Sequence, residues 1–288
     1  MKLFKKITDI DGTRKIYLFK IPVWSYYKPV ALPDFSYDIM KFKGLTQCKD
    51  LKNLILGSSH ARDGFIPSKN DFSLANSSQD LYRASKLYEY VVKHNGQELR
   101  NVILFWSVFH PGLELEKTRE FVRCIPYKGL YGIDYATKLP IDDKKGMDIL
   151  NKQIKTVICP TGFRGQATYN LEHFKEPTDV LVSKHLKNTM RNNNQIKYLG
   201  DIVKLARQKH HKVYVVLPPY RSDYLKCLPE ESIVYRELFD FLKENPDVKL
   251  LNFQLSSDFK DSDFDSPDHC NKSGGLKLTK KIKSALHK

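Results

Sequence analysis

Hydrophobic positions along the chain form short continuous runs that alternate with longer segments of helical period. The short apolar runs predict buried strands at residues 53–57, 102–106, 212–217 and 248–253. The periodic segments predict helices at residues 79–94, 195–209 and about 230–244, and from Ser273 to the end. Continuous apolar strands separated by amphipathic helices are typical of a parallel sheet that is covered on both faces. The pattern therefore predicts an α/β protein with three α/β/α layers and a mainly parallel central sheet.

Two regions depart from this pattern. Residues 1–45 contain short β-rich runs at 16–19 and 23–27, broken by prolines and an Asp-Gly pair, and predict a β-rich extension before a main domain at residues 46–288. Its mixture of aromatic residues and lysine suits a membrane surface, a partner chain, or packing on the same molecule. Residues 113–185 carry several prolines and glycines with little periodicity. We expect an insertion there that acts as a lid or substrate-recognition segment.

Composition limits the partners and the compartment. The 288 residues contain no apolar run long enough to span a membrane, and the basic N-terminus develops no apolar core of a signal peptide, so we expect a cytoplasmic protein. The five cysteines are scattered without metal-binding spacing, as expected of reduced thiols. The net charge of +15 would attract nucleic acid, an anionic glycan, a nucleotide-containing donor or the negative inner leaflet. Nucleic-acid binding predicts one basic stripe, whereas the lysines are spread along the chain.

The first candidate for chemistry is the segment Gly57-Ser58-Ser59-His60, which directly follows the first predicted strand. Ligands of open α/β sheets bind beyond the carboxyl ends of the strands, and a serine in the turn there can present its hydroxyl. Gly57 permits the sharp bend, and the amides of a following helix can stabilise an oxyanion. Taken alone, such a string also occurs in ordinary loops.

The second candidate lies between the last predicted strand and the last helix, where His269 is accompanied by Asp265 and Asp268. A histidine beside a carboxylate is a general base with an orienting partner, suited to accept the proton of Ser59. The alternative is a surface loop whose aspartates cap the terminal helix. Because both segments fall at the carboxyl edge of one predicted sheet, we favour the catalytic interpretation.

Together the two segments resemble the SGNH, or GDSL-like, superfamily of hydrolases and acyltransferases, which has a nucleophilic serine block after the first strand and a D-x-x-H block near the C-terminus. More narrowly, residues 55–60 followed by residues 73–82 are similar to SGNH-like proteins encoded with bacterial capsule and lipopolysaccharide genes. The resemblance covers about residues 50–110 and 195–288, and does not include the insertion.

The resemblance assigns roles residue by residue. Ser59 matches the nucleophile and its amide the first oxyanion donor, while Ser78 matches the glycine amide of the second block. The third block normally supplies an Asn side chain, but residues 105–112 contain none, so Ser107 or His110 would have to replace it. In the fourth block Ser266 stands where the acid is expected, which leaves Asp265 as the preferred orienting acid and Asp268 as the alternative.

Other polar residues near the predicted crevice are candidates for substrate binding, although each is also an ordinary surface residue. They are His60, Arg62, His110, Arg164, Tyr220 and Arg221. The chain has no phosphate-cradling glycine loop and no metal-ligand spacing, so we expect neither metal nor bound cofactor.

The sequence therefore favours an SGNH-type O-acetyltransferase that acylates a bacterial surface polysaccharide, or its precursor, through an acyl-enzyme on Ser59. Compartment and resemblance imply acetyl-CoA as the acyl donor and an oligosaccharide or polysaccharide as the acceptor, with peripheral contact to the inner membrane. A carbohydrate esterase would need the same residues. A glycan-binding or assembly protein that keeps the fold without activity is the third alternative. Hydrogen-bond distance between Ser59 and His269 would favour an enzyme, and a displaced His269 would favour the binding protein.

Overall fold

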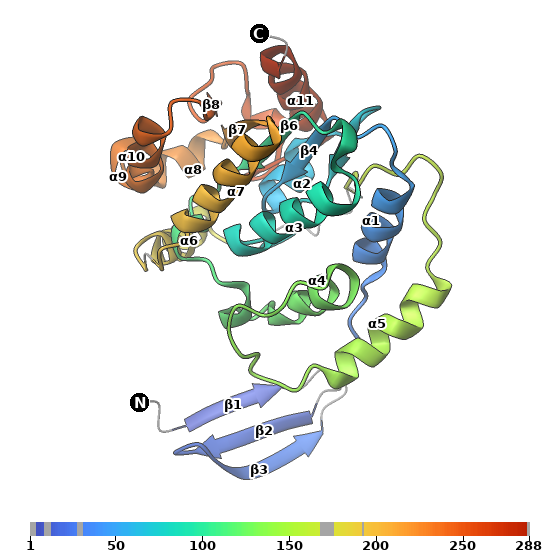
Figure 1. Cartoon of the computed structure of the whole chain (residues 1–288). Helices are drawn as coiled ribbons and strands as arrows, with labels where there is room; N and C mark the ends of the chain where they lie inside the picture. Colours follow the sequence, from blue (N-terminus) through green and yellow to red (C-terminus); the bar gives the residue numbers. More distant parts are fainter. Residues whose placement is uncertain (1–3, 9–12, 28–30, 168–175, 192, 287–288) are drawn as a thin grey trace. The chain divides into compact units, whose positions relative to one another are not determined.

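The computed structural model describes residues 4–8, 13–27, 31–167, 176–191 and 193–286 of the chain. The chain forms two compact units (Figure 1). The first combines Met1–Lys43 with Glu114–Pro160, and the second combines Gly44–Leu113 with Thr161–Lys288. The predicted insertion at 113–185 is thus divided at Pro160, and its residues 168–175 lie outside the described part.

The first unit contains an antiparallel sheet and a small group of helices. The strands pair in the order β1-β2-β3; β3 includes the expected run 23–27, and β2 includes the expected run 16–19 except Phe19, which lies in the turn. The elements are β1 (Phe4–Thr8), β2 (Thr13–Leu18), β3 (Ile21–Tyr27), α1 (Ser36–Gln47, which continues into the second unit), α4 (Cys124–Tyr131), α5 (Lys144–Thr156) and the 3-10 turns η3 (Leu115–Lys117) and η4 (Phe121–Arg123). Phe35 and Ile39 bury their side chains with Ile125, Leu130 and Leu150 in a core that joins both segments of this unit.

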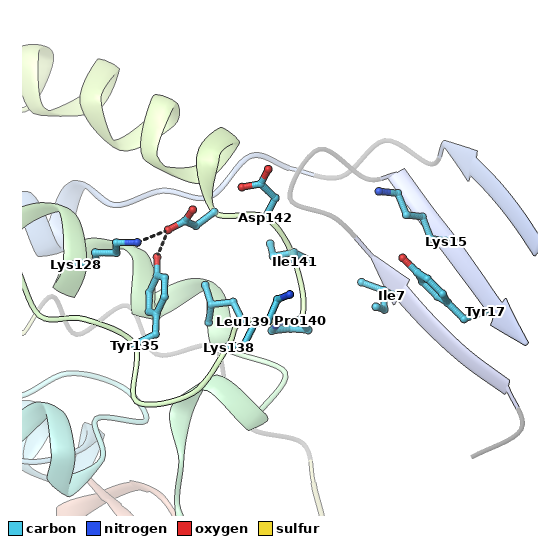
Figure 2. A pocket seen from close by; sticks show the side chains of 11 residues that line it. Ile7, Lys15, Tyr17, Lys128, Tyr135, Lys138, Leu139, Pro140, Ile141 and Asp142 are labelled. Carbon is cyan, nitrogen blue, oxygen red and sulfur yellow. Dashed lines mark hydrogen bonds and ion pairs between the residues drawn. The ribbon is translucent and has the colours of Figure 1, made fainter. Parts of the chain in front are cut away.

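One face of this small sheet lines a cavity of about 570 Å³ (Figure 2). Ile7, Lys15 and Tyr17 contribute from the strands, and residues 138–143 form much of the opposite wall. Lys128 Nζ and the Tyr135 hydroxyl both donate to Asp143 Oδ2, at 3.0 and 2.8 Å. The face of the sheet that carries Lys15 and Tyr17 is therefore turned toward the rest of the first unit.

The second unit is built on a five-stranded parallel sheet with the strand order β5-β4-β6-β7-β8. Four of the strands are β4 (Asn53–Leu56), β6 (Asn101–Phe105), β7 (Lys212–Leu217) and β8 (Lys249–Asn252), which match the four predicted strands to within one residue at each end. The edge strand β5 (Asp71–Ser73) was not predicted, because three residues that include Asp and Ser give no apolar run. The α/β prediction is confirmed at this level.

Helices flank the sheet and bury its apolar side chains. The elements of this unit besides the sheet are α2 (Ser59–Gly64), α3 (Leu81–His94), α6 (Thr178–Thr189), α7 (Ile196–Lys209), α8 (Ser222–Cys227), α9 (Glu231–Val234), α10 (Arg236–Glu244), α11 (Lys272–Leu286), the hairpin strands β9 (Phe264–Ser266) and β10 (His269–Cys270), and the 3-10 turns η1 (Gly96–Glu98), η2 (His110–Gly112) and η5 (Asp261–Asp263). The predicted helix at 230–244 is split into α9 and α10 at Tyr235, which leaves helical geometry (φ −111°, ψ 18°) with its ring buried.

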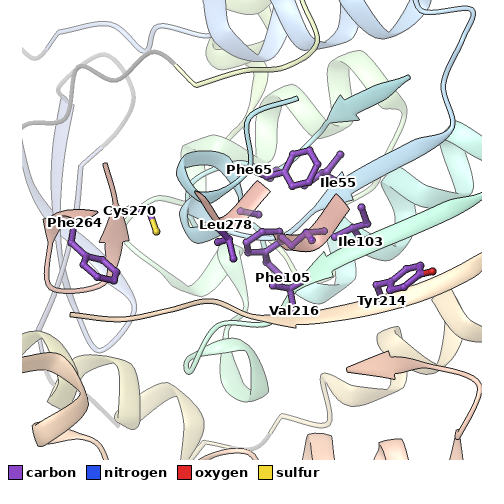
Figure 3. Close-up of a cluster of buried hydrophobic side chains, with 12 residues drawn as sticks. Ile55, Phe65, Ile103, Phe105, Tyr214, Val216, Phe264, Cys270 and Leu278 are labelled. Atoms are coloured by element: carbon purple, nitrogen blue, oxygen red, sulfur yellow. The ribbon is translucent and has the colours of Figure 1, made fainter. Parts of the chain in front are cut away.

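A hydrophobic core lies on the face of the sheet covered by α2 and α11 (Figure 3). Ile103 and Phe105 point to this face from β6, and Leu278 reaches them from α11. Successive residues of a strand point to opposite faces, so Val102 and Leu104 serve the other side, where α3 and α7 pack together. No helix of the described residues is long and apolar enough to cross a membrane.

The turn after β4 requires glycine. Gly57 has φ +128°, and a Cβ built on it would lie 2.8 Å from the backbone oxygen of Phe105 on the neighbouring strand. The amide of Gly57 donates to Gln79 Oε1 at 2.8 Å, which fixes the bend from β4 into α2.

We expect Gly57→Ala to lower the free energy of unfolding by about 1–3 kcal/mol, because the new methyl group forces both backbone strain and a clash. Urea unfolding followed by circular dichroism measures this change. The matched control is Gly200→Ala in α7, where the nearest atom is 3.9 Å away and helix propensity favours alanine by about 1 kcal/mol. Equal stability of Gly57→Ala and the unaltered protein would contradict the requirement.

Candidate active site

Ser59 lies at the carboxyl edge of the sheet, where the sequence predicted a nucleophile. Ser58 is the N-cap of α2, and Ser59 is the first residue of that helix. The Ser59 hydroxyl is 2.7 Å from Nε2 of His269, although the two residues are 210 positions apart in the chain. The two predicted segments therefore meet with the geometry of a nucleophile and its general base.

The acid beside His269 is Asp268, and the preference for Asp265 is corrected. Nδ1 of His269 is 2.9 Å from Oδ1 of Asp268, whereas Asp265 is exposed. The β9–β10 hairpin explains the difference. Ser266 pairs with His269 across it, so its neighbour Asp265 points to the opposite face. Asp268 lies in the turn of this hairpin, where its carboxylate reaches back to the ring.

Ser266 occupies the place where the superfamily pattern expects the acid. Its hydroxyl is 3.0 Å from Asp268 Oδ1 and 3.0 Å from His269 Nδ1. The serine donates to the carboxylate and stands beside the histidine that the carboxylate orients. The carboxylate that orients His269 therefore comes from the adjacent position, and a hydroxyl stands three positions before the histidine.

The second oxygen of Asp268 is bonded to another histidine. His60 Nε2 lies 3.0 Å from Asp268 Oδ2, and His60 Nδ1 lies 2.7 Å from the hydroxyl of Ser107. Ser107 is in turn 2.6 Å from the hydroxyl of Ser58. Since the carboxylate accepts from Nε2–H, Nδ1 of neutral His60 accepts from Ser107, whose oxygen accepts from Ser58. All four side chains are buried, and the chain of hydrogen bonds satisfies them.

This chain of bonds changes the expected role of His60. The sequence left it as a binder of an anionic donor, but its ring is buried and both ring nitrogens are used by Asp268 and Ser107. Burial lowers the pKa of His60, against the opposing effect of Asp268. His60 is therefore a neutral link that holds the second carboxylate oxygen.

Ser107 and His110, the expected replacements for the missing Asn, are also part of the buried network. The Ser107 hydroxyl bridges Ser58 and His60, while its amide donates to His110 Nδ1 at 3.0 Å. His110 Nε2 donates to the carbonyl of Gln79 at 3.2 Å, and burial lowers the pKa of His110 to about 3. The polar side-chain atoms of both residues bond to protein groups, so neither serves as the predicted oxyanion donor in this arrangement.

Gln79, which the sequence did not single out, joins the two loops of this edge. Its side chain accepts from the Gly57 amide at 2.8 Å and donates to the Leu74 carbonyl at 2.8 Å. The preceding residue, Ser78, is half-buried with φ +53°, in a turn closed by the Gln79 amide and the Asn76 carbonyl. Gln79 could have been noticed only as a polar residue before a helix, which is a weak signal.

Aromatic side chains surround the two histidines. The ring of buried Tyr220 is 5.5 Å from that of His60, and the ring of Phe109 is 5.6 Å away. His185 of α6 packs at 4.9 Å from Phe109 and bonds the Tyr224 hydroxyl at 2.7 Å. Burial lowers the pKa of His185 to about 4. Tyr220 thus lies beside the site as expected, whereas His185 was missed because it falls in the region without periodicity.

The three arginines expected to bind substrate each pair with an aspartate of the chain. Their partners are Asp63 for Arg62, Asp50 for Arg164 and Asp223 for Arg221. Arg62 lies one turn beyond Ser59 and also bonds Ser77. The Arg221 amide donates to the Pro267 carbonyl at 2.9 Å, which ties the end of β7 to the turn that holds Asp268. Their charges are therefore largely balanced by neighbours.

The charges of the site favour proton transfer from Ser59. Burial opposes charge on His269, but the charge of Asp268 and its hydrogen bond raise the pKa of His269 above its ordinary value. Burial also opposes ionisation of Asp268, yet its two histidine partners lower the pKa of this carboxyl well below the ordinary value. Asp268 stays ionised, and His269 holds its proton on Nδ1 with Nε2 directed at Ser59. The arrangement can take up and return the hydroxyl proton.

His60, Asp268 and His269 form the one group of described residues whose ligand atoms lie close enough together to hold a metal ion, within 4.8 Å of one another. The same atoms make the hydrogen bonds described above, so an ion there would have to displace them.

The chain matches no model of a known protein family, and a comparison with curated proteins also gives no match. The side chains that meet at this edge of the sheet are therefore the basis for a function.

We expect Asp268→Asn to lower the pKa of His269, because the variant removes the charge that opposes the effect of burial. NMR titration of the histidine ring signals measures the pKa directly. Asp265→Asn is the matched control, since it removes an exposed carboxylate one strand position from Ser266. A larger effect of Asp265→Asn than of Asp268→Asn would restore the original preference for Asp265.

Proposed function

We propose that this protein is an SGNH-type O-acetyltransferase, which transfers the acetyl group of a thioester to a hydroxyl of a bacterial surface polysaccharide or its precursor. The observation that carries the proposal is the 2.7 Å contact between Ser59 and His269, with Asp268 on the other ring nitrogen. A binding protein that had lost activity would have no need to keep this alignment. The five-stranded parallel sheet flanked by helices is compatible with the three-layer fold of that superfamily.

The reaction proceeds in two halves. His269 Nε2 takes the proton of Ser59 as its oxygen attacks the acyl carbonyl, and the leaving thiolate receives that proton when the tetrahedral intermediate collapses. A sugar hydroxyl then gives its proton to His269 and attacks the acyl-serine, and the proton returns to Ser59 as the ester product leaves. Asp268 keeps the ring in the required tautomer and stabilises the imidazolium of each half-reaction.

Backbone amides are the proposed oxyanion donors. The resemblance assigns them to Ser59 and Ser78, and these residues stand on the two loops that Gln79 ties together. Ser107 and His110 are both hydrogen bonded within the buried network, so neither replaces the oxyanion-binding Asn side chain that the superfamily pattern has in its third block. Loss of one donor costs on the order of 100- to 1000-fold in turnover in other enzymes, so we expect a slow catalyst.

The donor and the acceptor follow from charge and compartment. A net charge of +15 attracts both acetyl-CoA and an anionic glycan, and a cytoplasmic site would meet acetyl-CoA as a common acyl donor. An esterase would use water in the second half-reaction with the same side chains. The two activities therefore differ in what resolves the acyl-serine.

Intact-protein mass spectrometry after incubation with acetyl-CoA tests the proposal. We expect an adduct of about 42 Da, the mass of one acetyl group, on the unaltered protein and none on Ser59→Ala. Ser257→Ala, which changes an exposed serine, is the control and should acquire the same adduct. An adduct that persists until an oligosaccharide is added favours the transferase.

Other outcomes separate the alternatives. Rapid loss of an adduct formed from p-nitrophenyl acetate, with no transfer to sugars, would favour the esterase. Failure of Ser59 to react with acetyl-CoA, p-nitrophenyl acetate and a fluorophosphonate would contradict catalysis and leave the glycan-binding protein.

The hydrogen bonds that run from Asp268 through His60 to Ser107 give a second prediction. Ser107→Ala removes the donor to His60 Nδ1, so we expect Asp268 to lose part of its fixed orientation and the acylation rate to fall by about 10- to 100-fold. Ser107→Cys, which retains a weak donor, should recover part of the rate. The fluorophosphonate labelling rate as a function of pH measures the effect. An unchanged rate and pH profile would mean that the hydrogen bonds of His60 and Ser107 serve only to stabilise the fold.

The pH profile of Ser59 acylation has a definite direction. Only neutral His269 can accept the serine proton, so the rate should rise with pH through the pKa of His269. Because that pKa is raised, the midpoint should lie above the ordinary value for histidine. A profile with its midpoint below the ordinary value would contradict the charge arrangement.

A further inference from the structure

The β2–β3 turn and the start of β3 expose an unusual group of large apolar side chains. Phe19, Ile21, Val23 and Trp24 are all exposed, and Trp24 retains 65% of its accessible surface. The remaining exposed large apolar side chains of the described residues are isolated along the sequence, at positions 32, 158, 180, 190, 233, 255 and 276. Single exposed apolar residues are ordinary, but a contiguous group marks a contact surface. We call Phe19, Ile21, Val23 and Trp24 the apolar tip.

Cations and a tyrosine lie behind the apolar tip on the same sheet. Strand register places Ile16 beside Trp24 and Arg14 beside Tyr26 on one face. Lys6 Nζ and the Arg14 guanidinium lie 5.4 and 5.8 Å from the centre of the Tyr26 ring. The described residues of the three strands and the β2–β3 turn include no carboxylate. The face that carries Trp24 and Tyr26 is therefore apolar at one end and cationic further back.

This face is opposite to the one that lines the cavity of Figure 2. Lys15 and Tyr17 point toward that cavity, and residues 14 and 16 alternate with them along β2. The sheet thus has one face turned to its own unit, and Trp24 on the opposite face is exposed.

The two residues of the β2–β3 turn have a backbone conformation that their residue types disfavour. Phe19 and Lys20 have φ values of 48° and 75°, the left-handed region in which Asn and Gly are preferred at a two-residue hairpin turn. A phenylalanine there is an outlier for a bulky side chain. Phe19 and Lys20 therefore have a cost in backbone conformation at the end of the hairpin. We take this cost as a sign that their side chains make a contact outside the hairpin.

We propose that the β2–β3 hairpin docks the protein on an anionic lipid bilayer, with the apolar tip in the interfacial region and the cations on the phosphate headgroups. Trp and Tyr prefer the boundary between water and hydrocarbon, and lysine stems follow apolar surface while their charges remain at the headgroups. Anionic leaflets attract basic segments of this kind. This inference is independent of the proposed function, since it concerns only the sheet of the first unit.

A protein partner fits this surface less well. Lysine is depleted at protein interfaces, whereas it flanks the tip here. Two copies that pair through this face would each bring Lys6 and Arg14 to the interface, and the described residues of these strands offer no carboxylate to balance them.

The full-length chain and vesicles test the proposal. Of the two tryptophans, Trp106 is fully buried and Trp24 is exposed, so a change in emission on adding vesicles reports on Trp24. We expect a blue shift and co-sedimentation with phosphatidylcholine vesicles that contain about 30% phosphatidylglycerol, which supplies a negative surface potential. Binding to vesicles of phosphatidylcholine alone should be at least tenfold weaker. Binding should weaken as salt is added.

Two pairs of variants assign the contact. Phe19→Ser combined with Trp24→Ser should weaken vesicle binding at least tenfold, while Met190→Ser combined with Leu255→Ser, which changes exposed apolar residues of the second unit, should not. Lys6→Glu with Arg14→Glu should act like the tip variant, and Lys204→Glu with Lys209→Glu on α7 is its charge-matched control. Thermal unfolding verifies that each variant is folded.

Three results would overturn the proposal. The first is an absence of both blue shift and sedimentation for the unaltered protein, which needs no variant. The second is equal loss of binding in the tip and control variants. The third is a blue shift that follows protein concentration without vesicles, together with a dimer in sedimentation velocity, which would assign the tip to a second copy of the chain. Ser59 labelling by fluorophosphonate is unaffected by any of these results, so the two proposals fail separately.

Discussion

The buried carboxylate of Asp268 is the group on which the site depends, because each of its oxygens is bonded to a different histidine. Oδ1 accepts from His269 and Ser266, and Oδ2 accepts from His60. An ionised carboxylate in this environment is costly unless it is fully hydrogen bonded, and here every partner comes from the protein. Both histidines are thereby held in defined tautomers, one directed at Ser59 and the other at Ser107.

The parallel sheet makes this convergence possible. The ends of β4 and β6 are neighbours, so Ser58 and His60 after the first strand meet Ser107 after the second without any long loop. The hairpin that carries Asp268 is attached to the end of β7 through the backbone bond between Arg221 and Pro267. Rigid strand ends thus set the positions of side chains that must align within a few tenths of an ångström. The buried serines and histidines convert that alignment into one continuous network.

The sequence predicted the features that depend on local residue pattern. It failed for side chains whose positions depend on strand register or on tertiary contacts. The apolar runs located four of the five parallel strands. The two polar segments led to the prediction that Ser59 and His269 meet, and in the structure their side chains are 2.7 Å apart. The choice between Asp265 and Asp268 depended on the pairing of a short hairpin, which spacing along the chain does not show. His60 was expected to face a ligand because it adjoins Ser59, but the first turn of α2 directs it into the interior.

The core of the first unit joins residues on both sides of the segment 44–113. Phe35 and Ile39 find their apolar neighbours Ile125 and Leu150 only after a stretch of the chain that belongs to the second unit. During synthesis, Phe35 and Ile39 leave the ribosome well before Ile125 and Leu150, so their native contacts are completed only when Leu150 has also emerged. While the segment 44–113 is being made, Phe35 and Ile39 therefore lack these apolar neighbours, and the core of the first unit is completed only after that segment of the second unit has been synthesised.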